Sequence, residues 1–251
     1  MPELRVHPLA ALSEVRPGDD LAELIAAAAE PGCLGDGTVV AIAHKVVSKA
    51  EGAMVALVDV TPSARAIELA ADGEKDPRQV QVILDETAEL VRAERGVLIC
   101  RTRHGFVCAN AGVDTSNAPD GDTVIVLPRD PDASARALRA RLHDLTGVRP
   151  AILISDSFGR AWRHGQLDVA LGLAGLAPLD DWRGREDSRG LVLAATWLAV
   201  ADAAAATADL ARAKDSREPV VLLDGLERFV SENDGPGAAA LLRAREEDLF
   251  L

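Results

Sequence analysis

The sequence predicts an α+β fold, with mixed or antiparallel sheets and helices that flank them. Helix and strand patterns both occur along the 251 residues, but they lack the strict β-α-β alternation of a doubly wound sheet. Hydrophobic residues make up 48% of the chain and charged residues 27%, which is typical of a globular protein. This length allows one or two domains with a sizeable core.

Each expected element begins or ends at a recognisable signal. Aspartate, alone or before proline, caps the first turn of a helix, glycine ends a helix, and β-branched apolar runs form buried strands. The expected helices run from Asp19-Asp20 to about Ala29, from Asp76-Pro77 to Gly96, from Asp130-Pro131 to Gly147, and over Ala203–Ala213. The expected strands are Thr38–Ala43, Val97–Cys100, Phe106–Cys108, Thr123–Leu127, Ala151–Ser155 and Pro219–Leu223.

The helix patterns also predict which side chains face the core. In the second expected helix, the apolar stripe continues through Leu90 and Val91. In the third, Leu138, Leu142 and Leu145 face inward. Two connections look long, 110–122 and 156–190, and long polar connections in a compact chain are where function tends to lie.

Charge and composition exclude several functional classes. Lys and Arg number 27 against 40 Asp and Glu, so the net charge is -13 and a general nucleic-acid binder is not expected. The most apolar stretch, 191–200, is too short to cross a membrane. Three scattered cysteines do not form a disulfide framework, and no secretory signal opens the chain. We therefore expect a cytoplasmic protein that binds neither nucleic acid nor membrane.

Common catalytic and nucleotide-binding motifs are absent. There is no GxxxxGK[ST], no GxGxxG after a strand and no HExxH. The five histidines are dispersed, which does not favour a histidine metal site. No GxSxG marks a serine nucleophile, although a Ser-His-Asp triad stays open.

The segment His44–Gly52 directly follows the first expected strand. If it is helical, Lys45 and Lys49 share one face, because they are four residues apart. A lysine at the end of a buried strand is well placed to meet a phosphate as a point charge. The alternative is a solvated pair of surface lysines.

The segment 108–117 (CANAGVDTSN) combines small residues with oxygen ligands. Small residues let the backbone approach a ligand closely, and Asp114 and Asn117 supply a carboxylate and an amide. A plain turn has the same composition.

The segment 155–166 (SDSFGRAWRHGQ) follows an expected strand that ends at Asp156. Mg²⁺ commonly takes one or two carboxylates together with substrate phosphates, so Asp156 can pair with Asp114 around an ion. Arg160 and Arg163 can clamp an anionic substrate through bidentate contacts. The alternative is a salt-bridged turn with Phe158 and Trp162 in the core.

Taken together, these segments resemble the coenzyme F-420:L-glutamate ligases, also called F-420-0 gamma-glutamyl ligases. The matching pieces occur in the family's order over nearly the whole chain: RPGDDL at 16–21, KVVSKAEG at 45–52, ANAGVDTSN at 109–117, SDSFGRAWRHGQ at 155–166, DWRGREDSRG at 181–190 and EDLF at 247–250.

The resemblance implies a GTP-dependent ligase that adds L-glutamate to coenzyme F-420-0 as a gamma-linked amide, through an acyl phosphate. It also implies divalent metal, Mg²⁺ or Mn²⁺, with two ions per site. The family fold has two intertwined subdomains and forms a homodimer. We therefore expect one gamma-glutamyl-ligase-like domain over 1–251, with room for two subdomains and no fused nitroreductase-like domain.

The resemblance also assigns roles to matched positions. Arg160 and Arg163 remain candidate substrate contacts, and no general base is visible. The implied GTP contacts are Leu12, Ser13, Glu14, Val15, His44, Lys49 and Asn117, and the implied metal ligands are Asp114 and Asp156 for one ion and Ser157 for a second.

Departures from the family pattern gather in the C-terminal third. Glutamates that the family usually has near Trp197 and Ala203 are missing. Two alternatives therefore stand beside the ligase: a related GTP-dependent amide ligase with a different carboxylate acceptor, and a non-catalytic GTP- or deazaflavin-binding protein.

Overall fold

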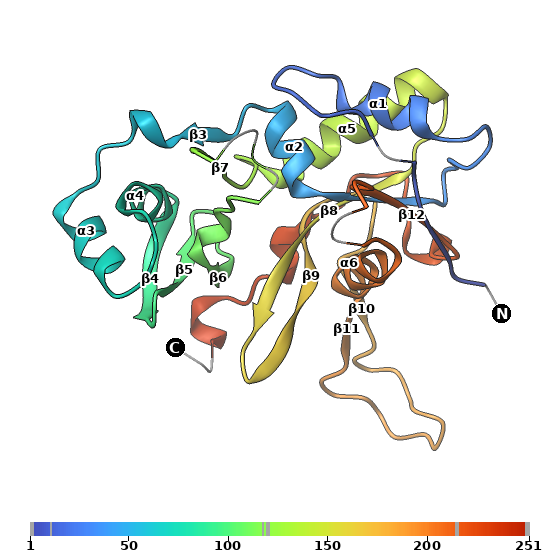
Figure 1. Cartoon of the computed structure of the whole chain (residues 1–251). Coiled ribbons are helices and arrows are strands. Elements are labelled where there is room, and N and C mark those ends of the chain that lie inside the picture. The colour runs from blue at the N-terminus through green and yellow to red at the C-terminus, as the bar shows by residue number, and fades with distance from the viewer. Residues whose placement is uncertain (1–2, 11, 117, 119–120, 214–215, 249–251) are drawn as a thin grey trace.

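The computed structural model (Figure 1) describes residues 3–10, 12–116, 118, 121–213 and 216–248. Its helices are α1 (Leu21–Ala28), α2 (His44–Ala50), α3 (Ala64–Ala71), α4 (Pro77–Asp85), α5 (Pro131–Thr146) and α6 (Val200–Ala211). Its strands are β1 (Arg5–Pro8), β2 (Val39–Ala43), β3 (Met54–Ala56), β4 (Thr87–Glu94), β5 (Val97–Thr102), β6 (Val107–Ala109), β7 (Thr123–Ile125), β8 (Ala151–Arg160), β9 (Arg163–Ala174), β10 (Leu179–Asp181), β11 (Trp197–Ala199) and β12 (Val220–Asp224). Short 3-10 turns cover Leu57–Asp59, Asn110–Gly112, Glu227–Phe229, Ala238–Leu241 and Arg245–Glu247.

The largest sheet is mixed and has the order β1-β12-β2-β8-β9. Strand β2 runs parallel to β8, and the other neighbours are antiparallel. Side chains alternate between the two faces of each strand. In β2, Val40 and Ile42 pack with α1, α2 and α5, whereas Val39 and Ala41 pack with α6. Helices therefore cover both faces of this sheet (Figure 1).

A separate core lies beside the large sheet. Helices α3 and α4 pack against the antiparallel sheet β4-β5-β6, and the pair β3-β7 joins them. Its buried residues include Ile83 of α4 and Cys100 of β5. The α+β class, with mixed and antiparallel sheets, is confirmed.

Many of the expected elements are confirmed. Helix α1 begins after Asp20, whose carboxylate accepts the N–H of Glu23 at 3.1 Å. Helix α5 follows Asp130 and ends at Gly147, which has a left-handed φ of 77°. Strands β2, β5, β6, β7 and β12 lie where the apolar runs predicted strands. The sequence patterns did not predict β1, α3 or β9.

The predicted helix from Asp76-Pro77 to Gly96 is wrong in its second half. The helix ends at Asp85, and Leu90 and Val91 lie in strand β4, which pairs with β5. Gly96 does not end a helix. It is the second residue of a two-residue hairpin turn with Arg95, and both have positive φ, as a hairpin of this kind requires.

Two further predictions need correction. Leu145 is 38% exposed and does not face the core. The strand at Ala151 does not end at Asp156 but continues to Arg160, because it pairs with β9 beyond the point where its pairing with β2 stops. Much of the expected long connection 156–190 is therefore a β-hairpin. Among the helices of the described residues, none has both the length and the apolar character to cross a bilayer.

Candidate active site

The site lies where β2 gives way to α2. Because β2 and β8 are parallel and Ala43 pairs with Ser155, the next residues, His44 and Asp156, follow side by side. His44 is buried, and its Nε2 lies 3.4 Å from Asp156 Oδ1. This atom makes no hydrogen bond among the described residues, so a buried polar group faces the site without a hydrogen-bond partner there.

A tight turn at 110–112 places Asp114 close to the start of α2. Asn110, Ala111 and Gly112 all have left-handed φ values, of 54°, 53° and 74°. This conformation is unfavourable for residues with a Cβ, and such strain often gathers at functional sites. Gly112 is required because a Cβ would lie 2.7 Å from the side chain of Leu127. The backbone of Asp114 then pairs with Ile125 of β7, at 2.8 and 3.0 Å.

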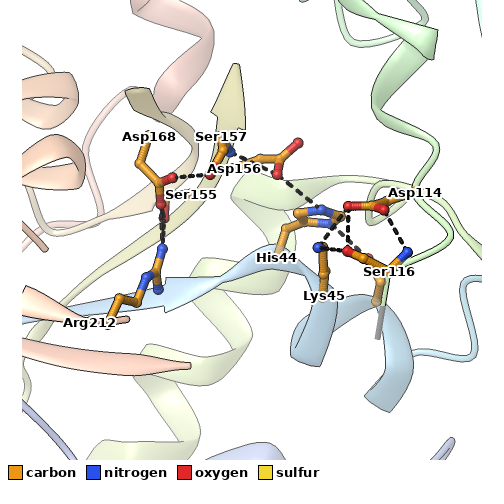
Figure 2. Close-up of polar contacts among 10 residues, drawn as sticks. His44, Lys45, Asp114, Ser116, Ser155, Asp156, Ser157, Asp168 and Arg212 are labelled. Carbon is orange, nitrogen blue, oxygen red and sulfur yellow. Dashed lines mark hydrogen bonds and ion pairs between the residues drawn. The ribbon is translucent and has the colours of Figure 1, made fainter. Parts of the chain in front are cut away.

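The Asp114 carboxylate is held by a lysine and a serine (Figure 2). Lys45 Nζ lies 2.7 Å from Asp114 Oδ2 and donates to Ser116 Oγ at 2.5 Å. The N–H and hydroxyl of Ser116 both donate to the carboxylate, at 2.7 and 2.9 Å. Burial alone raises the pKa of Asp114, but the hydrogen bonds from Lys45 and Ser116 outweigh it and lower the pKa. Asp114 is therefore an anion at neutral pH.

Asp114 contacts Lys45, and Asp156 contacts His44. Because His44 and Lys45 are consecutive residues, the fold brings the two acids close to the same place. Figure 2 shows the two acids flanking these residues at the start of α2. The Asp156 carboxylate also accepts the N–H of Ser157 at 2.8 Å. Asp156 is thus not sealed in a buried salt bridge, and its side chain is partly exposed.

Ser157 points to a cluster that the sequence patterns did not reveal. Its hydroxyl donates to Asp168 at 2.6 Å, and Ser155 donates to the other oxygen of Asp168 at 2.8 Å. Arg212, just after α6, forms an ion pair with this carboxylate, which is fully buried. A signal was present, because Asp168 interrupts the otherwise apolar run at 167–174, but nothing local points to Arg212.

Lys49 lies one helical turn after Lys45 and is buried. Its Nζ lies 2.5 Å from the carboxylate of Glu14, an exposed residue. Glu14 belongs to the segment 12–15, which the family resemblance predicts to be a nucleotide-binding turn. Within that turn Val15 is buried, Ser13 is exposed and Leu12 is intermediate. The ion pair links this turn to α2. Asn117, the remaining predicted GTP contact, lies outside the described residues.

The two predicted arginine clamps lie away from this cluster. Arg160 and Arg163 are the last paired residues of the β8-β9 hairpin, and Arg160 donates to the carbonyl of His164 at 2.6 Å. Arg160 follows Asp156 by four residues, which is roughly 13 Å along a strand. Trp162, at the tip, is 81% exposed, so the alternative that placed it in the core is wrong.

The arrangement suits a ligand that carries phosphates. Within the described ranges, no group of three or more His, Cys, Asp or Glu side chains is placed to hold a metal ion. Mg²⁺ does not need such a group, since it usually combines one or two carboxylates with substrate phosphates and water. Asp114 and Asp156 are two carboxylates close to the start of α2, and Lys45 and Lys49 of that helix carry positive charge.

Comparison with known proteins decides the family. Residues 10–225 match the family described as F420-0:gamma-glutamyl ligase. The chain belongs to this family. Coenzyme F420:L-glutamate ligase of Methanopyrus kandleri is 47% identical over 252 residues, covering 100% of this chain and 98% of that protein. The enzymes of the same name from Methanothermobacter thermautotrophicus and Haloarcula marismortui are 44% and 40% identical, covering 93% and 98% of this chain and 93% and 95% of their own lengths.

The F420-0:gamma-glutamyl ligase match contains the complete cluster. His44, Lys45, Asp114 and Asp156 lie within 10–225, and so do Asp168 and Arg212. The family resemblance drawn from the sequence segments is therefore confirmed.

Proposed function

We propose that this protein is a coenzyme F-420:L-glutamate ligase, which joins the amine of L-glutamate to a carboxylate of F-420-0 through a gamma-linked amide. The observation that carries the proposal is 47% identity to an enzyme of that name across the whole chain. Its support in the structure is a pair of carboxylates and two lysines at the start of α2.

The proposed reaction has two steps. GTP transfers its γ-phosphoryl group to the acceptor carboxylate, which leaves GDP and an acyl phosphate. The amine of glutamate then attacks the acyl carbon, an amide bond forms, and inorganic phosphate leaves with the electron pair of the broken C–O bond. The amine also loses a proton, and we assign no residue as its acceptor.

The chain's own residues mainly bind and orient the reactants, as phosphoryl transfer requires little covalent chemistry from the protein. Lys49 and the turn at 12–15 would hold the nucleotide. The Lys45 ammonium would bind a phosphate after its ion pair with Asp114 is broken. The buried Nε2 of His44 faces Asp156 Oδ1 at 3.4 Å and makes no hydrogen bond among the described residues. The anionic Asp114 and the partly exposed Asp156 would hold a divalent ion, Mg²⁺ or Mn²⁺, and that ion would neutralise phosphate charge.

The test is a product assay. The protein is incubated with GTP, Mn²⁺, L-glutamate and F-420-0, and the deazaflavin is analysed by mass spectrometry. We expect a product heavier by one glutamate residue or more, formed only when GTP is present. The matched control is Asp156→Asn, which keeps the shape of the side chain and should lose product formation while its circular dichroism is unchanged.

Two other outcomes would replace the proposal. If a folded wild-type protein releases phosphate with glutamate and another acid but not with F-420-0, the acceptor is different. The family resemblance leads us to expect glutamates near Trp197 and Ala203, where this sequence has none, and this favours the second candidate. If GTP or F-420-0 binds in calorimetry and no product forms, the protein is a non-catalytic binder.

We also propose that the protein is a homodimer. The arm formed by β10, β11 and the loop between them projects from the body (Figure 1). It exposes Leu191, Val192, Trp197 and Leu198, and exposed apolar side chains that gather on one segment often mark an interface. Sedimentation equilibrium should give twice the mass of the chain, and a single-chain mass would reject the dimer.

A further inference from the structure

Asp168 is the most deeply buried acid near the site, with no exposed surface. Both of its oxygens accept hydrogen bonds, one from Ser157 at 2.6 Å and the other from Ser155 at 2.8 Å. Arg212 lies against the same carboxylate and is itself 9% exposed (Figure 2). A buried carboxylate needs a compensating positive charge, and here a guanidinium supplies it.

The family resemblance implies a second divalent ion at Ser157, and this environment does not fit one. The hydroxyl proton of Ser157 is directed to Asp168, and the charge of Asp168 is already compensated by Arg212. A divalent ion at the Ser157 oxygen would bring a second positive charge to the carboxylate that the buried guanidinium of Arg212 already compensates, and like charges repel strongly where water is excluded. Both oxygens of Asp168, the carboxylate that the Ser157 hydroxyl contacts in this cluster, already accept hydrogen bonds from serine hydroxyls, and one of them also faces Arg212.

Asp156 has a different environment, although it is the next residue. Its side chain points to the other face of β8, toward His44, and among the described residues no lysine or arginine nitrogen lies within 4.0 Å of its carboxylate. Because side chains alternate along β8, the Asp156 carboxylate and the Ser157 hydroxyl lie on opposite faces of the strand, and the hydroxyl is hydrogen-bonded to the carboxylate that Arg212 pairs with.

We propose that this chain holds one divalent ion per active site, at Asp114 and Asp156, and that Arg212 supplies at Ser157 and Asp168 the positive charge of a second ion. The proposal rests on the proposed function for the presence of the first ion. Ser157 and Asp168 are then positioning residues, which fix β8 and β9 behind Asp156.

The test counts the metal ions bound to the protein. The protein is dialysed to equilibrium against Mn²⁺ and a GTP analogue with an imido β,γ-bridge, and bound Mn²⁺ and nucleotide are measured per chain. We expect one Mn²⁺ for each bound nucleotide. Two ions per nucleotide would overturn the inference and leave the ligase proposal intact, and a count of zero would also overturn it.

Adjacent substitutions on β8 separate the two roles. Ser157→Ala should leave the dissociation constant for Mn²⁺ within about twofold, whereas Asp156→Asn should raise it by about tenfold or more. Equal losses of affinity would make Ser157 a metal ligand and overturn the inference.

The role given to Arg212 has its own test. If folded, Arg212→Gln leaves Asp168 uncompensated and should bind a second Mn²⁺, whereas Arg212→Gln combined with Asp168→Asn should bind one. The double variant is the control because it removes both charges of the ion pair. An unchanged count in a folded Arg212→Gln protein would overturn the assignment. Failure of the ligase proposal would be seen separately, as absence of glutamylated product.

Discussion

At the scale of single residues, the proposed role of Lys49 in GTP binding can be tested by one substitution. It is buried, and its ammonium contacts Glu14 from the predicted nucleotide-binding turn. Lys49→Ala should raise the GTP concentration needed for half-maximal rate by about tenfold or more and change the glutamate requirement much less, because the proposed contact of this ammonium group with a GTP phosphate would be lost. Steady-state kinetics with each substrate varied would measure this, and equal shifts for both substrates would contradict it.

Asp202 of α6 provides a prediction about pH. Its carboxylate accepts the N–H of Ala170 at 2.9 Å, yet burial dominates and raises its pKa above the ordinary value of 3.8. The protonated carboxyl is the form that the buried site favours. Its contribution to stability is therefore fully present below the unfolded pKa and is lost as pH rises through the folded pKa. Asp202→Asn keeps the acceptor and removes the charge. It should raise Tm at pH 7 and leave Tm unchanged near about pH 3, which thermal unfolding at both pH values would show.

At the scale of elements, the left-handed turn before Asp114 determines where this carboxylate lies in the site. Gly112→Ala adds a Cβ at positive φ that would collide with Leu127. We expect a loss of about 1–3 kcal/mol in unfolding free energy and weaker Mn²⁺ binding, because Asp114 is two residues away.

A matched substitution in the same region controls for loss of glycine itself. A Cβ added at Gly121 would meet no heavy atom within 4 Å, and Gly121 has no positive φ. Gly121→Ala should therefore leave both urea unfolding and Mn²⁺ affinity unchanged. If the two variants behave alike, close packing against Leu127 is not what requires glycine at position 112.

Elements with local signals were predictable, and those fixed by distant partners were not. The caps of α1 and α5 act within one turn, so the sequence alone reveals them. Residues 87–94 carry an apolar pattern that suits a helix as well as a strand, and pairing with β5 decides between them. In the same way, only the partner β9 extends β8 beyond Asp156.

At the scale of the whole molecule, Arg139 of α5 joins distant segments. It is 1% exposed and donates to the carbonyl of Pro150 at 3.0 Å, to Asp234 at 2.8 Å and to the carbonyls of Ser231 and Glu232. Arg139→Met should cost about 3–5 kcal/mol, since it leaves buried acceptors without donors. Urea unfolding would measure this loss.

Arg141 offers the comparison on the same helix. It makes ion pairs with Asp20 and Glu23 but is 43% exposed. Exposed ion pairs contribute little to stability, so Arg141→Met should shift the urea midpoint far less than Arg139→Met. Similar losses would mean that burial is not the cause.

The candidate site was partly predictable for the same physical reason as the fold. Asp114 and Asp156 lie in segments whose composition marks them, so each was found separately. Their common location at the start of α2 depends on parallel pairing of β2 with β8. Asp168 and Arg212 are 44 positions apart, and their ion pair exists only after β9 and α6 pack together.

The strand order of the large sheet has a consequence for synthesis on the ribosome. Strand β2 is made early, yet its two neighbours are β8 and β12, and β12 ends at Asp224. The backbone of β2 therefore stays without its strand partners until most of the chain has left the ribosome. Proteins whose contacts are this distant in sequence fold slowly and expose aggregation-prone strands in the meantime. We therefore expect nascent chains of this protein to fold more efficiently with chaperones that bind the β2 segment during translation.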